Sequence, residues 1–207
     1  MFSFPEGLNP AMNPLAWLPG AWKGWGVISY PGVPDQVVLQ DITFTYEETP
    51  WLRQESRLYT VTEDSAALVE REMTGAQGVA VLERGQLLSV ETSYWRPSAV
   101  TAEGEPVQAV DTLGDPEDAA GNVAVGGHFE VLSTDPSGYV MMWVGQAEGP
   151  RIQMVTDAVV RSPDAPELNA ATRLFALVES DLMWAQDVAA LGHELQSYIS
   201  GRLSREA

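Results

Sequence analysis

The sequence predicts an all-β protein, an antiparallel barrel or sandwich, and two observations support this prediction. Apolar and polar residues alternate in short runs. In DITFTYEE, for example, Ile42, Phe44 and Tyr46 alternate with polar residues, which is the period of a half-buried strand. The runs are separated by tight turns and leave little room for helix. At 207 residues, the chain is long enough for a single domain (1–207) with a substantial core.

Further strands are expected in the second half of the chain. The segment 151–160, RIQMVTDAVV, places four residues on one face: Ile152, Met154, Thr156 and Ala158. The segment 171–191 predicts two strands joined by a short hairpin at Glu179-Ser180-Asp181. QLLSVETSYW (86–95) and GYVMMWVGQ (138–146) add two further β runs.

Three segments depart from the strand pattern. NPLAWL (13–18) offers Asn13 as a helix N-cap with Pro14 at the first helical position, which predicts one or two short turns. The insertion at 62–84 fits an extra hairpin or a short helix. The insertion at 98–127 carries six acids, no base and no aromatic residue. Such a composition cannot offset its ordering entropy by burial, so we expect a mobile acidic loop there, with a functional lid as the alternative.

The charge balance excludes several classes of partner. Against 29 acidic residues stand 11 basic ones, a net charge of −18, and this field repels nucleic acid and anionic membranes. No apolar run approaches the roughly 18–20 residues of a membrane span. The N-terminus shows no signal peptide, and cysteine is absent, which excludes disulfides and thiolate metal sites. These features predict a cytoplasmic protein.

The stretch LAWLPGAWKGWGVISYPG (15–32) places bulky rings beside glycines. Gly20, Trp22, Gly24 and Gly26 share the parity of one strand face. In one interpretation Trp22 plugs the barrel floor while the glycines allow sharp curvature. In the other, the glycines leave space for a flat apolar ligand. Spacing alone favours the first.

The same stretch resembles a known family. GAWKGWG (20–26) is similar to the GxWxGxG signature of the nitrobindins, haem-binding β-barrels shaped like fatty-acid-binding proteins, and YPG (30–32) resembles their YPT. Blocks at 85–97, 151–163 and 173–192 resemble later strands of the family in the same order. The resemblance covers roughly residues 15–203 and implies an up-and-down, lipocalin-like barrel of about ten strands.

The resemblance also implies where haem contacts would lie, and here the chain departs from the family. The proximal histidine position falls on Tyr198, a glutamine position on His193, and the threonine of YPT on Gly32. The chain therefore resembles a ferric nitrobindin-like member without the haem-ligating histidine. The implied cofactor-binding positions are Gly20, Trp22, Gly24, Gly26, Gly32 and Tyr198.

Other residues are poor substitutes for the missing histidine. His193 lies five residues before Tyr198, an odd offset of about 16 Å along a strand, so it reaches the ligand position only if GHEL forms a turn, which favours a rim location instead. His128 has no partner spacing, and Met141 and Met142 fit ordinary strand residues. Tyr198 could ligate ferric iron as a phenolate, given a nearby cation, although a core ring with a paired hydroxyl is the simpler interpretation.

The sequence thus predicts a nitrobindin-like barrel that has lost normal haem ligation and binds a hydrophobic small molecule, or haem only weakly. It predicts no catalytic residue and no metal ligand set, and haem b is the cofactor that the resemblance allows. The alternative is a ferric haem protein ligated through Tyr198, with peroxynitrite isomerase or nitric oxide chemistry. A third hypothesis, an acidic loop that contacts a basic protein partner, has no specific support.

Overall fold

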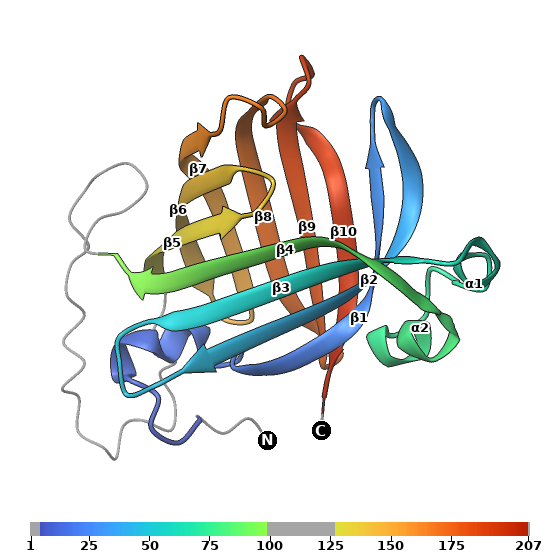
Figure 1. Ribbon diagram of the computed structural model, residues 1–207. Helices are drawn as coiled ribbons and strands as arrows, with labels where there is room; N and C mark the ends of the chain where they lie inside the picture. Colours follow the sequence, from blue (N-terminus) through green and yellow to red (C-terminus); the bar gives the residue numbers. More distant parts are fainter. Residues whose placement is uncertain (1–4, 99–126, 207) are drawn as a thin grey trace.

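Ten antiparallel strands form a closed barrel in the computed structural model, which describes residues 5–98 and 127–206. Each strand pairs with its neighbour in the chain, and β1 pairs with β10 to close the barrel (Figure 1). The predicted up-and-down barrel of about ten strands is therefore confirmed. Closure leaves no free sheet edge, which removes the usual route to edge-to-edge aggregation.

The strands are long, of nine to fourteen residues. They are β1 (Gly20–Tyr30), β2 (Val33–Tyr46), β3 (Leu52–Val61), β4 (Arg84–Pro97), β5 (Gly127–Asp135), β6 (Tyr139–Glu148), β7 (Arg151–Arg161), β8 (Leu168–Val178), β9 (Asp181–Ala190) and β10 (Gln196–Arg205). The helices are η1 (Pro10–Leu15), α1 (Glu63–Ala66) and α2 (Gly75–Val81).

The structure contains the alternation predicted for β2 and the hairpin predicted between β8 and β9. In β2, Ile42 and Phe44 are buried and the threonine between them is exposed, as the alternation requires. The β8–β9 hairpin, expected at Glu179-Ser180-Asp181, turns at Glu179 and Ser180, whose φ angles of 52° and 74° are those of a two-residue primed turn, and Asp181 already belongs to β9. The loop is short because its left-handed backbone matches the twist of the flanking strands.

The predicted face of β7 is wrong at its last member. Ile152 and Met154 are buried, but Ala158 is exposed. The register between β6 and β7 shifts so that Asp157 is an extra residue, a β-bulge. One extra residue reverses the inward parity, and Val159 packs against the core instead.

The predicted cap of the N-terminal helix is also wrong. The 3-10 helix η1 begins after Asn9, whose side-chain oxygen accepts a hydrogen bond from the Ala11 amide at 3.1 Å, and Pro14 lies inside the helix. Two Asn-Pro pairs carry the same cap signature, and the earlier one is used. Starting there lets Met12 and Leu15 bury their side chains against the barrel.

Of the two alternatives for the insertion at 62–84, the structure has helix. α2 packs on the outer face of β1 and β10. It begins with a capping box, in which Thr74 and Gln77 exchange side-chain and backbone hydrogen bonds. The outward indole of Trp25 lies under α2 and donates to the Thr74 carbonyl at 3.3 Å. The insertion therefore covers an apolar ring on the outside of the barrel.

The acidic insertion expected at 98–127 falls outside the described residues, apart from its two ends, so its mobility stays a prediction. Within residues 5–98 and 127–206, no helix combines the length and the apolar character needed to cross a bilayer.

Candidate functional site

One half of the barrel is filled by aromatic rings. The Trp95 ring lies 5.3 Å from that of Phe129, 5.7 Å from Phe44 and 5.8 Å from Phe175, measured between centroids. Helix η1 covers this end, and Leu18 beyond it is fully buried. The end at which β4, β6, β8 and β10 begin carries no such plug among the described residues.

A cavity of about 510 Å³ occupies the other half of the barrel. This volume lies within the range of small-molecule sites. Its mouth is formed where β1, β5 and β9 end and β6, β8 and β10 begin. The side chains at the mouth include Tyr30, Asp135, Tyr139, Glu167, Leu191 and Tyr198. The cavity wall is largely apolar, but its deep part carries a group of polar residues.

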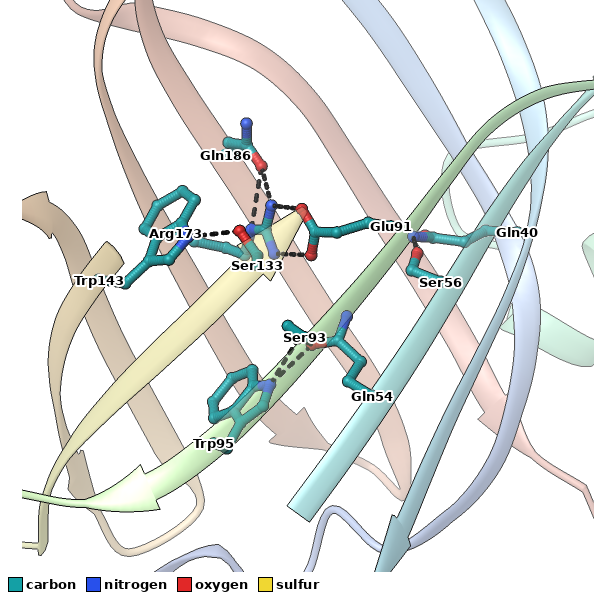
Figure 2. Close-up of polar contacts among 10 residues, drawn as sticks. All are labelled: Gln40, Gln54, Ser56, Glu91, Ser93, Trp95, Ser133, Trp143, Arg173 and Gln186. Carbon is teal, nitrogen blue, oxygen red and sulfur yellow. Dashed lines mark hydrogen bonds and ion pairs between the residues drawn. The ribbon is translucent and has the colours of Figure 1, made fainter. Parts of the chain in front are cut away.

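A buried ion pair forms the centre of this polar group (Figure 2). The Arg173 guanidinium donates to both Glu91 carboxylate oxygens, at 2.8 and 2.9 Å, and to Gln186 Oε1 at 2.6 and 2.9 Å. Its guanidinium carbon also lies 4.8 Å from the centroid of the Trp143 ring. Arg173 and Glu91 side chains are only 6% and 13% exposed. The cation inside the barrel is thus neutralised and almost fully bonded.

Two further glutamines are held by indole groups. Gln54 Oε1 accepts from Trp95 Nε1 at 3.0 Å, and Gln40 Oε1 accepts from Trp184 Nε1 at 2.6 Å. An indole nitrogen is only a donor, so these bonds determine which end of each amide is oxygen. Gln40 also donates to Ser56 Oγ at 3.1 Å.

Of the six positions implied by the resemblance, only Tyr198 lines the cavity. Its side chain is half-buried at the mouth, and its ring meets that of Tyr30 edge-on with centroids 6.0 Å apart. The Tyr198 hydroxyl has no hydrogen-bond partner among the described residues. The positions away from the cavity are Gly20, Trp22, Gly24, Gly26 and Gly32.

The β1 glycines allow close approach of the neighbouring strand. A Cβ at Gly24 would overlap the Arg202 carbonyl oxygen of β10, and one at Gly26 would lie 2.5 Å from the Ser200 carbonyl oxygen. Trp22 fills the closed end, where its indole donates to the Leu18 carbonyl at 2.8 Å. The space beside the Trp22 ring, which one interpretation of the sequence reserved for a flat ligand, is therefore occupied by protein.

Gly32 lies in the β1–β2 turn after Pro31. Its φ of +79° with proline before it matches a type II turn, which requires φ > 0 at that position. A Cβ at Gly32 would meet no atom within 4 Å. The residue is glycine for its backbone conformation, and a threonine here would be strained.

Neither histidine lines the cavity. His193 lies in the β9–β10 turn, where Leu191 and Gly192 have φ angles of 53° and 78°, and it is exposed. Its ring meets that of Tyr30 edge-on, with the two ring centroids 5.9 Å apart. The turn that we considered for GHEL (192–195) is therefore present, and it places His193 near the rim of the barrel. His128 is half-buried on β5.

The described residues do not offer haem iron a fitting axial ligand. No imidazole lines the cavity. Of its three phenols, Tyr30 and Tyr139 already donate to backbone carbonyls. Tyr198 and the thioether of Met141 are therefore the candidate donors without such a bond. Burial and the negative charge of Asp135 both raise the pKa of Tyr198, the direction opposite to phenolate formation. Arg173, which could stabilise a phenolate, is already paired with Glu91. Within the described part of the chain, no group of three acidic or histidine side chains could hold a metal ion either.

A closed β-barrel with an internal cavity of this size is of the class that encloses small ligands. Residues 11–205 match the family model of the THAP4-like, heme-binding beta-barrel domain. The chain therefore belongs to the nitrobindin family, which confirms the membership predicted from the ordered motifs.

Named relatives span the whole chain. A ferric nitrobindin-like protein of Beutenbergia cavernae is 41% identical over 100% of this chain and 99% of its own length. A peroxynitrite isomerase of Clavibacter michiganensis subsp. michiganensis is 33% identical over 99% of this chain and 98% of its own. The crystal structure of Rv2717c from M. tuberculosis shares the fold, with a TM-score of 0.67 at 21% identity, covering 97% of this chain and 99% of that one.

The polar interior was not predicted from the sequence. A signal was present in β2, where Gln40 shares the parity of Ile42 and Phe44 and so interrupts an inward apolar face. Arg173 stands likewise between inward Ala171 and Phe175 on β8. A polar residue at an inward position needs a partner, and that requirement could have indicated the site.

Proposed function

We propose that this chain is a nitrobindin-family barrel that has lost ordinary haem ligation and binds a hydrophobic small molecule in its cavity. The observation that carries this proposal is a cavity of about 510 Å³ with Tyr198, and no histidine, among its lining residues. Such a pocket keeps its apolar walls but lacks the usual anchor for iron.

The electrostatics at the mouth support the same conclusion. Burial raises the pKa of Tyr198, and the negative charge of Asp135 raises it further, so the neutral phenol is favoured at physiological pH. A neutral phenol is a poor ligand for ferric iron, since haem proteins with a tyrosine ligand use the phenolate.

The alternative is a ferric haem protein ligated through Tyr198, with peroxynitrite isomerase or nitric oxide chemistry. The name of the Clavibacter relative, at 33% identity, supports this alternative. It requires the Tyr198 proton to be lost when haem binds.

Titration of the purified protein with hemin distinguishes the two. We expect no sharp Soret band at a 1:1 ratio, whereas an apolar fluorescent dye such as Nile red binds in the cavity. A tight 1:1 hemin complex that disappears in Tyr198→Phe but persists in Tyr139→Phe contradicts our proposal and supports the alternative. Tyr139 is the matched control because it is a second phenol at the same mouth, bonded to the Pro166 carbonyl at 2.8 Å.

A gain-of-function variant provides a second test. Tyr198→His should create or strengthen hemin binding, because it restores an imidazole at the position that the resemblance assigns to the iron ligand. Gly32→Thr, the other departure from the family motif, is left out, since a φ of +79° would strain a threonine. Unchanged hemin affinity in Tyr198→His would mean that the cavity has lost the shape for porphyrin as well as its ligand.

A further inference from the structure

We propose that the cavity selects an uncharged apolar molecule carrying a hydrogen-bond acceptor of the carbonyl type, which one of two side-chain amides, that of Gln54 or that of Gln186, binds. This inference rests on the proposed function and names the chemistry of its ligand. It follows from an imbalance between donors and acceptors in the cavity wall.

The acceptor oxygens of the polar group are already used. Both Glu91 oxygens and Gln186 Oε1 accept from Arg173. Gln54 Oε1 accepts from Trp95 and Ser93, at 3.0 and 3.2 Å. A ligand therefore meets few acceptors that lack a partner.

Two side-chain N–H donors in the cavity wall, by contrast, have no hydrogen-bond partner in the part of the chain that the structure describes. Gln54 is 1% exposed and Gln186 is 9% exposed, and both line the cavity. Neither amide nitrogen has a hydrogen-bond partner among the described residues. Because the oxygen of each amide accepts hydrogen bonds, the orientation of each amide group is determined, and its other end is the NH2 group. Figure 2 shows both nitrogens without an interaction. N–H groups that face a cavity with largely apolar walls gain free energy when an acceptor on the ligand reaches them, so such an acceptor is favoured.

Charge excludes an anionic head group. The Arg173 cation is neutralised by Glu91, so no unpaired cation is available in the described wall. Asp135 and Glu167 stand at the mouth, and the whole chain carries a net charge of −18. A carboxylate or phosphate would enter against this field without a counterion inside, whereas a ketone, ester or amide would not.

Three ligands of equal chain length test the inference: 2-undecanone, undecane and undecanoic acid, each measured at pH 7.5 by displacement of Nile red from the full-length protein. One neutral hydrogen bond predicts that the ketone binds roughly tenfold more tightly than the alkane. We expect the acid to bind more weakly than the ketone. Equal affinities for ketone and alkane, or tighter binding of the acid, would overturn the inference.

Variants assign the effect to one of the two amides. Gln54→Met or Gln186→Met, whichever removes the amide that binds the ketone, should reduce the preference for ketone over alkane. Val188→Ala, an apolar change in the same wall, should weaken both ligands equally and leave their ratio unchanged. Because Gln54→Met also removes the acceptor for Trp95, its folding is checked by circular dichroism, and the side-chain amide shifts of wild-type protein provide a readout that needs no variant. The inference is contradicted if both methionine variants keep the full preference, or if ketone moves neither amide signal. Failure of all three ligands and of Nile red to bind would instead refute the proposed function.

Discussion

Glu91→Gln should destabilise the folded barrel by about 3 kcal/mol, the lower end of the range of about 3–5 kcal/mol for removing one partner of a buried ion pair. The substitution keeps the shape of the side chain but removes the charge that faces Arg173. Of the two bonds of 2.8 and 2.9 Å, one is lost because the amide NH2 group faces a guanidinium donor, and the other keeps only a neutral acceptor. A guanidinium at 6% exposure is left without a counterion inside the barrel.

The lower end of the range is expected for structural reasons. Arg173 keeps its two bonds to Gln186 and its position over the Trp143 ring, so part of its stabilisation survives. Glu91 also lines the cavity, where water can partly solvate the unpaired cation. For a chain of this size the melting temperature should fall by roughly 6–12 °C.

Urea unfolding, followed by tryptophan fluorescence, measures the loss. The matched control is Glu55→Gln, which removes a carboxylate that lies 2.8 Å from Arg57 on the outer surface, with side-chain exposures of 34% and 48%. This exposed pair should contribute less than about 1 kcal/mol.

A double-mutant cycle completes the test. Arg173→Met and Glu91→Leu should each be destabilising alone, but the two combined should recover most of the loss, because no unpaired charge remains. The reasoning is refuted if Glu91→Gln costs no more than Glu55→Gln, or if the two core substitutions are additive.

Three further predictions follow from particular contacts. Burial and the charge of Glu91 raise the pKa of Asp135, so its charged form costs stability above the folded-state pKa. Asp135→Asn should therefore stabilise the protein at pH 8, and urea unfolding at several pH values should show this advantage shrinking as pH falls toward 3.8; an advantage independent of pH contradicts the assignment. Gly24→Ala places a methyl group against the β10 backbone and should cost about 1–3 kcal/mol in the same assay, whereas Gly149→Asn, at an open left-handed turn, should cost much less. Gly78→Ala places a methyl group against the Trp25 indole, so α2 amides should exchange hydrogen faster than in wild type, and unchanged exchange would mean that α2 does not depend on this contact.

Local sequence patterns predicted much of the fold. Alternation in β2 and the two-residue connection between β8 and β9 depend on residues a few positions apart, so they can be recognised without coordinates. The same local patterns failed where two choices were equal or where one residue was added. Nothing near Asn9 distinguishes it from Asn13, and the bulge at Asp157 depends on how β6 and β7 align.

The polar interior depended on closure of the barrel. Glu91 and Arg173 are 82 residues apart, on β4 and β8, which are not neighbouring strands. They meet across the inside because ten strands curve into one barrel. The need for glycine at position 24 also depends on closure, because a side chain there would overlap the backbone of β10, which lies far along the chain.

By itself, the sequence determined the all-β class, the family and the tyrosine at the position of the family's haem ligand. Each of these follows from residue identity and short-range order. Only the tertiary structure decided that the β1 glycines lie against a neighbouring strand and that the cavity contains a neutralised arginine with unpartnered amide donors. These features are set by distances between strands, which a chain acquires only when the barrel closes.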